Sequence, residues 1–154
     1  DRMKESIFNT IGPYFDGGVI LDLFGGAGAL TLEALSRGAS YSYINDLSKD
    51  AIKIIKENIH SLEQDKNITV MNTDYRQVLL RLKDKKFDLV FLDPPYSMNI
   101  TNEIIDFLLE NQMLNTGAII ICQYIKGNHK IVNELNLIKN YAYGTSEVSI
   151  YQKD

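Results

Sequence analysis

The stretch Val19-Ile20-Leu21-Asp22-Leu23-Phe24-Gly25-Gly26-Ala27-Gly28-Ala29-Leu30 decides the fold of this chain. Its first half, from Val19 to Phe24, is apolar apart from one acid, which is typical of a short strand buried on both faces of a sheet. The glycines that follow allow a tight turn and a close approach between the backbone and a ligand. The pattern from Ala27 to Arg37 predicts a helix that Gly38 closes. A buried strand, a glycine turn and a helix in this order indicate the first unit of a parallel sheet.

Strand and helix patterns alternate along the rest of the chain. Further strands are predicted at Tyr41–Asn45, Ile68–Met71, Phe87–Leu92 and Ala118–Cys122. Further helices are predicted at Met3–Ile11, Tyr75–Leu82, Thr101–Glu110 and Asn128–Leu135. One more helix is predicted to follow a cap at Asp46 or Ser48. Leu137–Tyr143 and Glu147–Tyr151 are predicted to pair as a hairpin around Gly144. The sequence therefore predicts an α/β fold with a doubly wound, mostly parallel seven-stranded sheet, helices on both faces and an antiparallel hairpin strand at the carboxyl end.

The composition is that of one ordinary folded domain, with 154 residues, 45% apolar and 23% charged. No apolar run approaches the length of a membrane-spanning helix, and the charged first residues argue against a secretory signal. The net charge of −4 is unfavourable for a protein that holds nucleic acid through bulk electrostatics. Cys122 is the only cysteine and is expected in the core, which fits a reducing cytoplasm. His60 and His129 lack the spacing of metal ligands, so no metal site is expected.

The glycine loop lacks the features that phosphate groups demand. A dinucleotide fingerprint needs a third small residue where Thr31 stands, and the loop has no lysine of the kind found in nucleotide triphosphatases. S-adenosylmethionine (SAM) fits this loop, because it carries an ammonium, a carboxylate and a sulfonium but no phosphate. The alternative is a glycine-rich turn that binds nothing.

Acidic residues stand at or beside the carboxyl ends of the first four predicted strands, where doubly wound sheets bind ligands. They are Asp22, Asp46, Asp74 and Asp93. We expect Asp46 to accept hydrogen bonds from ribose hydroxyls, and Asp74 to accept from an adenine amino group with Tyr75 as an apolar wall. The alternative for both Asp46 and Asp74 is a helix N-cap.

The tetrapeptide Asp93-Pro94-Pro95-Tyr96 follows an almost wholly apolar strand. Two prolines fix the backbone in an extended form, so the Asp93 carboxylate and the Pro94 carbonyl become two fixed acceptors. Such a pair can accept both hydrogens of an exocyclic amine and direct its lone pair at an electrophile. Tyr96 offers a flat face for stacking a base. The alternative is a rigid turn with an incidental aromatic residue.

At these residues the chain resembles known enzymes. Asp22–Leu30 together with Asp93–Tyr96 resembles the amino-methylating class I SAM-dependent methyltransferases, whose sheet is Rossmann-like. Four further segments, at 1–9, 12–15, 33–39 and 143–151, are similar to a bacterial family that methylates N2 of a guanine in 16S ribosomal RNA. The resemblance covers essentially the whole chain.

The resemblance implies a complete functional assignment. The substrate would be 16S rRNA, within a small ribosomal subunit or an assembly intermediate, and the enzyme would be a cytoplasmic monomer that uses SAM without metal or membrane. Residues 1–154 would form one methyltransferase domain that lacks a short basic N-terminal segment. The catalytic residues would be Asp93, Pro94, Pro95 and Tyr96, and the cofactor-binding residues Asp22, Phe24, Gly25, Gly26, Ala27, Gly28, Asp46, Leu47, Asp74 and Tyr75.

The chain departs from the family at three places, and other readings stay open. The family usually has Ala at Gly25 and Ser at Ala27, and tends to have Glu where Gln123 stands. The same chemistry on adenine N6 in DNA or RNA, or on a protein side chain, is one alternative, and a SAM-binding module without catalysis is another. Four cations near the strand ends are candidates for RNA phosphate contacts or ordinary surface charge: Lys49, Arg76, Lys126 and Lys130.

Overall fold

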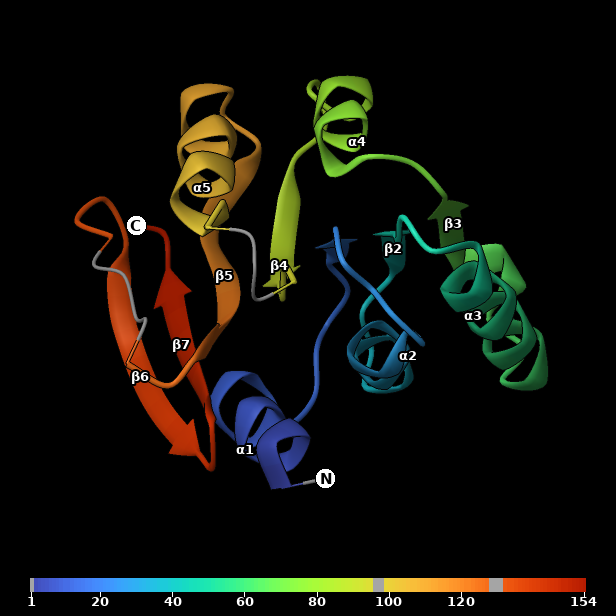
Figure 1. The fold of residues 1–154 in the computed structure, drawn as a ribbon, viewed down its shortest axis with the longest axis horizontal. Coiled ribbons are helices and arrows are strands. Elements are labelled where there is room, and N and C mark those ends of the chain that lie inside the picture. Colours follow the sequence, from blue (N-terminus) through green and yellow to red (C-terminus); the bar gives the residue numbers. More distant parts are fainter. Residues whose placement is uncertain (1, 96–98, 128–131) are drawn as a thin grey trace.

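The computed structural model describes residues 2–95, 99–127 and 132–154. Strands and helices alternate through most of the chain, as predicted (Figure 1). The elements are α1 (Arg2–Ile11), β1 (Val19–Asp22), α2 (Ala29–Ser36), β2 (Tyr41–Asn45), α3 (Lys49–Ser61), a short 3-10 turn (Asp65–Asn67), β3 (Ile68–Met71), α4 (Tyr75–Arg81), β4 (Phe87–Leu92), α5 (Thr101–Glu110), β5 (Leu114–Ile125), β6 (Asn136–Tyr143) and β7 (Ser146–Gln152).

The strands form one seven-stranded sheet in the order β3-β2-β1-β4-β5-β7-β6. The pairs from β3 to β5 are parallel, whereas β7 runs antiparallel between β5 and β6. The strand order reverses direction at β1, which lies between β2 and β4. This reversal is the switch point at which such sheets bind ligands. The predicted doubly wound sheet with an antiparallel hairpin is confirmed.

Helices cover both faces of the sheet, with α1, α2 and α3 on one face and α4 and α5 on the other (Figure 1). The alternation of side chains along β1 explains this arrangement, since Ile20 packs with Ile7 and Phe8 of α1 while Leu21 packs with the α4 and α5 side chains. Ile44 of β2 joins α2 and α3 in a third buried cluster. Because both faces are covered, β1 and β4 are apolar apart from Asp22 and Asp88.

Hydrogen bonds connect α1 to the C-terminal hairpin. The Ser6 and Thr10 hydroxyls bond those of Tyr143 and Tyr141 on β6. These contacts place the first helix against the last hairpin, although the two are far apart in the sequence (Figure 1). None of the described helices has the length and apolar content that a membrane span requires.

Several predicted boundaries are wrong near the glycine loop and near β5. β1 ends at Asp22 and α2 begins only at Ala29, because Gly28 has a φ of 83° and therefore stands outside the right-handed helix. β5 covers Leu114–Ile125 and is much longer than the predicted 118–122, because it pairs with β7 along most of its length.

The predicted helix at 128–135 is wrong in its second half. Residues 128–131 lie outside the described residues, and residues 132–135 form turns that lead into β6. Val132 and Leu135 have helical spacing, yet both are buried in the core cluster beside α5 from a turn. Apolar residues three positions apart fit a helix and a turn over the core equally well, so the spacing misled the prediction. Cys122 is buried as expected, and His129 and Lys130 lie outside the described residues.

Candidate active site

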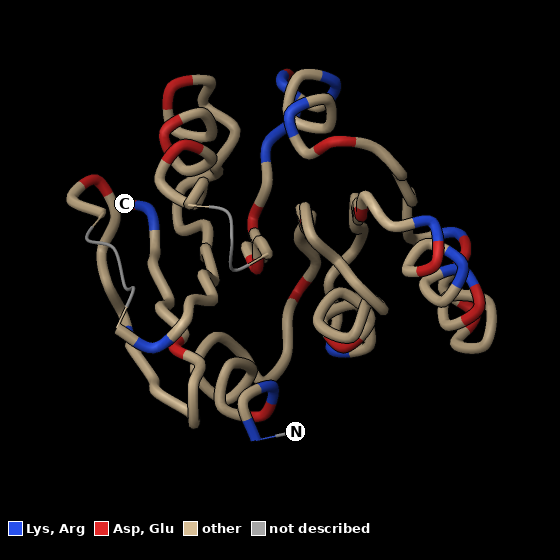
Figure 2. Tube along the Cα trace, in the orientation of Figure 1, with Lys and Arg blue, Asp and Glu red and all other residues tan. Residues whose placement is uncertain are grey.

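The four acidic residues predicted at the strand ends converge at the carboxyl edge of the sheet. Asp22 is the last residue of β1, Asp46 and Asp93 follow β2 and β4 directly, and Asp74 follows β3. Asp22 is close enough to Asp46 and Asp93 for their negative charges to influence its ionisation. Figure 2 shows acidic positions near the middle of the fold as well as on the outer helices, and most of the basic positions toward the outside. The edge therefore suits a ligand that carries positive charge.

The glycine loop is shaped by close packing against β2. A Cβ atom on Gly25 would lie 2.3 Å from Cγ1 of Ile44, so a larger residue needs that buried side chain to move. The Gly25 N–H donates to the Asn45 carbonyl at 2.8 Å, and the Gly26 N–H donates to Asp46 Oδ2 at 2.9 Å. Gly26 and Gly28 both have positive φ angles, which other residues rarely adopt.

Asp46 is held by two backbone donors rather than acting as a helix cap. Its Oδ2 accepts from Gly26, and its Oδ1 accepts from the Ser48 N–H at 2.9 Å. The N-cap of α3 is Ser48, whose hydroxyl accepts from the Ala51 N–H at 3.2 Å. The N-cap alternative for Asp46 is therefore wrong. Its oxygens keep lone pairs for further donors.

Asp74, in contrast, is the N-cap of α4. It accepts from the Arg76 N–H at 2.8 Å and its other oxygen lies 3.6 Å from the Arg76 guanidinium. The N-cap alternative is confirmed for this residue, although its side chain also lines a cavity. Arg76 also approaches Glu103 at 3.9 Å, so its charge is shared between two acids.

Asp22 is buried at 4% exposure. Burial raises its pKa from 3.8 to about 7, while the hydrogen bond that the Thr31 hydroxyl donates at 2.7 Å opposes that rise. The residue that breaks the dinucleotide fingerprint, Thr31, thus ties the end of β1 to α2. In the sequence, Thr31 excludes a dinucleotide fingerprint but gives no sign of its contact with Asp22.

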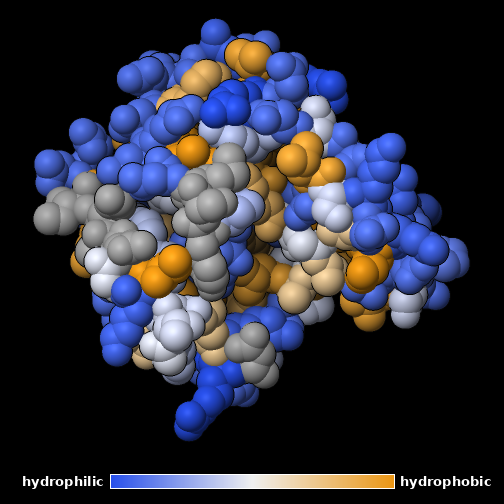
Figure 3. All heavy atoms as spheres, in the orientation of Figure 1, coloured by the Kyte–Doolittle hydropathy of each residue, from blue (hydrophilic) through white to orange (hydrophobic). Residues whose placement is uncertain are grey.

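A cavity of about 330 Å³ opens at the ends of β1, β2, β3 and β4. Figure 3 shows a hollow with apolar surface near the centre of the face over β1 and β4. On one side of the cavity the rings of Phe24 and Tyr75 lie 5.5 Å apart, and Leu47 is 73% exposed at its rim. Its lining residues are Leu23, Phe24, Asn45, Asp46, Leu47, Thr73, Asp74, Tyr75, Asp93, Pro94 and Pro95.

Asn45 orders the floor of this cavity, a role that the sequence analysis missed. Its side-chain nitrogen donates to the carbonyls of Leu23 and Thr73 at 3.2 and 2.9 Å, and its oxygen accepts from the Thr73 N–H at 3.1 Å. One buried amide therefore fixes the loops after β1 and β3 relative to each other. The only sequence signal was a polar residue at the end of an otherwise half-apolar strand.

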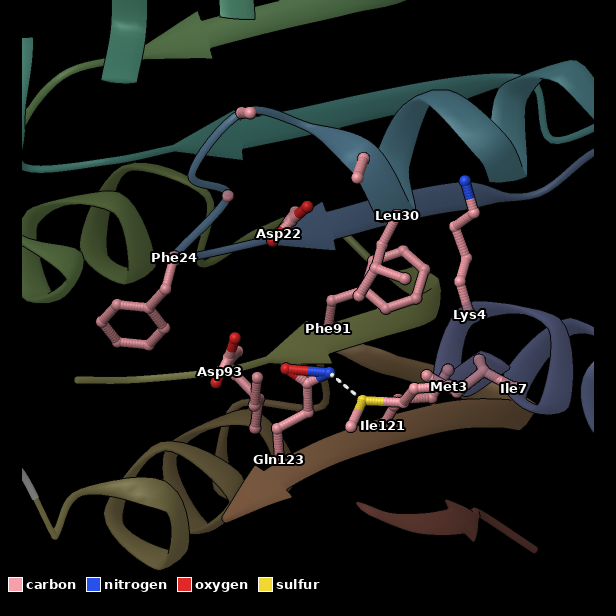
Figure 4. Close-up of a pocket in the computed structure, with 14 residues that line it drawn as sticks. Met3, Lys4, Ile7, Asp22, Phe24, Leu30, Phe91, Asp93, Ile121 and Gln123 are labelled. Atoms are coloured by element: carbon pink, nitrogen blue, oxygen red, sulfur yellow. Dashed lines mark hydrogen bonds between the residues drawn. The ribbon is translucent and has the colours of Figure 1, made fainter. Parts of the chain in front are cut away.

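A second cavity of about 180 Å³ lies on the α1 side of the glycine loop (Figure 4). Phe24 and Asp93 line both cavities, so the two meet at the end of β4. The wall is mostly apolar, and Asp22, Asp93, Gln123 and Lys4 supply its charged and amide groups. Its lining residues are Met3, Lys4, Ile7, Asp22, Phe24, Gly25, Ala27, Ala29, Leu30, Phe91, Leu92, Asp93, Ile121 and Gln123.

Asp93 stands where the two cavities join. The residue as a whole is exposed, yet it lines both cavities, and desolvation by partial burial raises the pKa of its carboxyl above the ordinary value. Pro94 is buried and holds the chain as it leaves β4. Tyr96, predicted to stack a base, lies outside the described residues.

Gln123 of β5 faces Asp93 across the second cavity (Figure 4). With its amide nitrogen turned toward the carboxylate, Gln123 donates to Asp93 Oδ2 at 2.6 Å and to Oδ1 at 3.2 Å. In the orientation drawn, the nitrogen instead points at Met3 Sδ, 3.3 Å away. A carboxylate is a far stronger acceptor than a thioether, so the first orientation is favoured.

The structure brings most of the predicted site residues to these two cavities. Phe24, Asp46, Leu47, Asp74, Tyr75 and Asp93–Pro95 line the larger one, and Asp22, Phe24, Gly25, Ala27 and Asp93 line the smaller one. Gly26 and Gly28 shape the loop without lining either cavity. Within the described ranges, no group of three His, Cys, Asp or Glu residues is arranged to hold a metal ion.

The sheet order, the antiparallel β7 and the glycine loop at the switch point define a class I methyltransferase fold. A family model described as "Conserved hypothetical protein 95" matches residues 1–152, and the chain belongs to this family. The family resemblance predicted from the sequence is confirmed.

Individual relatives agree with this assignment. The chain is 38% identical over 157 residues to "Putative rRNA methyltransferase YlbH" of Bacillus subtilis, covering 99% of this chain and 85% of that protein. It is 34% identical over 155 residues to "Ribosomal RNA small subunit methyltransferase D" of Haemophilus influenzae, covering 99% and 80%. A solved structure of a conserved hypothetical protein of Streptococcus pyogenes superimposes with a TM-score of 0.88 at 35% identity, covering 98% and 95%.

Proposed function

We propose that this chain is a SAM-dependent methyltransferase of ribosomal RNA that methylates the exocyclic N2 amine of a guanine in 16S rRNA. The observation that carries the proposal is the meeting of two cavities at Asp93, beside the glycine loop and before two prolines. A methyl donor in one cavity and an amine in the other would face each other there. Relatives named as rRNA small subunit methyltransferases support the choice of substrate.

The residues at the carboxyl edge fit SAM. The Phe24 and Tyr75 rings offer an apolar wall of the kind that receives a purine, and Asp46 keeps lone pairs that can accept from ribose hydroxyls. Asp22 and Asp93 surround the junction with negative charge, which favours a sulfonium. When bound, SAM supplies an electrophilic methyl group on that positively charged sulfur.

Asp93 and the Pro94 carbonyl act on the amine. By accepting both N–H groups they orient the nitrogen lone pair toward the methyl group, and preorganised acceptors of this kind lower the barrier without reorganising. As the N–C bond forms, the S–C bond breaks and its electron pair stays on sulfur as a neutral thioether. The alkylated nitrogen is then acidic and releases a proton to water, so no strong base is required.

The substrate is proposed to be a small ribosomal subunit or an assembly intermediate, methylated by a monomer in the cytoplasm. The net charge of −4 supports a structured target over naked RNA, since bulk attraction to phosphates is weak. The described candidates for phosphate contacts are Lys49, Arg76 and Lys126. Arg76 is paired with two acids and is therefore the weakest of the three.

A methyl-transfer assay tests the proposal. Purified protein is mixed with radiolabelled SAM and with small subunits, naked 16S rRNA or large subunits from cells that lack the modifying enzyme. We expect label in small subunits at about one methyl per particle, and calorimetric binding of S-adenosylhomocysteine. Tight binding of that product without methylation of any RNA would instead indicate a SAM-binding module, and label in DNA or protein would indicate another amine.

A further inference from the structure

Gln123 owes its place beside Asp93 to strand register. β4 and β5 pair in parallel with Leu92 opposite Cys122, so the next residues along, Asp93 and Gln123, emerge side by side at the carboxyl edge. Both line the smaller cavity, and the other end of the Gln123 amide lies against the Met3 sulfur of α1. The amide is thus confined between α1 and Asp93.

The contact between the two side chains is short. With the Gln123 amide turned toward the carboxylate, its nitrogen lies 2.6 Å from Asp93 Oδ2 and 3.2 Å from Oδ1, which is the geometry of a donor to an ionised carboxylate. We propose that Gln123 is a positioning residue that holds Asp93 ionised and oriented as an acceptor for the substrate amine. This inference rests on the proposed function and adds to it a residue that the four-residue corner does not contain.

The charges around Asp93 suit a neutral donor at position 123 of this chain. Asp22 of β1, Asp46 after β2 and Asp74 before α4 share the cavities with Asp93, and Lys4 of α1 lines the smaller one. Partial burial favours the protonated form of Asp93, which would lose acceptor capacity. A hydrogen bond from an amide N–H opposes protonation without bringing another charge.

The proposal makes opposite predictions for two variants of similar shape. In Gln123→Met the donor is gone, so the pKa of Asp93 rises and the rising limb of the pH–rate profile moves to higher pH. In Gln123→Glu two carboxyls lie at hydrogen-bond distance and share one proton. As pH increases and that proton is lost, the two charges repel each other and Asp93 is displaced, so the rate falls at high pH. The control is Gln77→Met, an exposed glutamine of α4.

The test combines two measurements on the full chain. Single-turnover methylation of small subunits is followed from pH 5.5 to 9, and the Asp93 carboxyl is titrated by carbon-13 NMR without substrate. For Gln123→Met we expect the rising limb of the pH–rate profile and the NMR titration of Asp93 to move together to higher pH, by on the order of one pH unit. At pH values below this limb, the methylation rate should be roughly tenfold lower than that of the unaltered protein. Gln77→Met should match the unaltered protein in both measurements, and thermal melting checks that each variant is folded.

The NMR arm separates this inference from the proposed function. If no RNA is methylated but the Asp93 titration still shifts in Gln123→Met, the proposed function fails while the contact stands. If methylation occurs and the profiles of Gln123→Met and the unaltered protein coincide, Gln123 does not position Asp93. A titration of Asp93 that is the same in all folded variants overturns the inference.

Discussion

Removal of the Asp93 carboxylate separates cofactor binding from methyl transfer. Asp93→Ala deletes one of two fixed acceptors at the junction of the cavities, whereas the larger cavity keeps Phe24, Tyr75, Asp46 and its other lining residues. Loss of one preorganised polar group costs roughly 2–4 kcal/mol of barrier, a rate reduction of about 30- to 800-fold. The affinity for S-adenosylhomocysteine should change by less than about threefold, because that ligand carries no charge on sulfur.

The assay compares single-turnover methylation of small subunits with calorimetric affinity for S-adenosylhomocysteine. Asp84→Ala is the matched control, since it removes an exposed aspartate in the turn before β4 and should leave both quantities unchanged. A rate equal to that of the unaltered protein would refute the role of Asp93. So would a loss of cofactor affinity as large as the loss of rate, because Asp93 would then act through binding.

Three further changes test other parts of the structure. Asp46→Ala should weaken S-adenosylhomocysteine binding by roughly 1–3 kcal/mol in calorimetry, because the carboxylate that fixes the Gly26 N–H and faces the cavity is lost; unchanged affinity would remove Asp46 from the site. Asp22 has a pKa of about 7 in the folded protein and 3.8 in the unfolded chain, so the folded state binds more protons between these pH values. The free energy of unfolding in urea, compared with that of Asp22→Asn, should therefore fall from about pH 4 to 7 and level off above. Parallel curves for the two proteins would contradict the burial of an ionisable Asp22. Gly38→Ala should destabilise the protein by about 2–4 kcal/mol in denaturant melts, because φ is 116° and a Cβ would lie 2.1 Å from the Phe15 carbonyl oxygen. Gly127→Ala, where φ is 91° and no atom lies within 4 Å of the added Cβ, should cost about 1–2 kcal/mol. Equal costs would show that the contact with Phe15 does not matter.

The sequence predicts the sheet well because buried parallel strands leave a strong pattern. β2, β3 and β4 begin and end at the predicted residues, and the buried strand β4 has the clearest apolar pattern of the three. The predicted end of the first strand, at Phe24, is two residues too late, because Leu23 and Phe24 are apolar but line a cavity after β1 has ended. The turn at 132–135 was mistaken for a helix, because spacing alone does not distinguish the two.

Only part of the site can be predicted from the sequence, because some of its contacts depend on how the strands pair. Asp46, Asp74 and Asp93 could be found because each follows a predicted strand, so topology alone brings them to one edge. Asn45 and Gln123 make their contacts across strands, and those contacts depend on register, which the sequence does not show. Thr31 stands nine residues from Asp22 and meets it only through the turn into α2.

The identity of the methylated nucleoside tests the central claim most directly. Small subunits from cells lacking the modification are incubated with the protein and SAM, and the 16S rRNA is digested to nucleosides and analysed by mass spectrometry against synthetic standards. We expect N2-methylguanosine at about one per particle with the unaltered protein, and strongly reduced amounts with Asp93→Ala. N6-methyladenosine in its place, or no methylated nucleoside although S-adenosylhomocysteine binds tightly, would contradict the assignment of a guanine N2 methyltransferase.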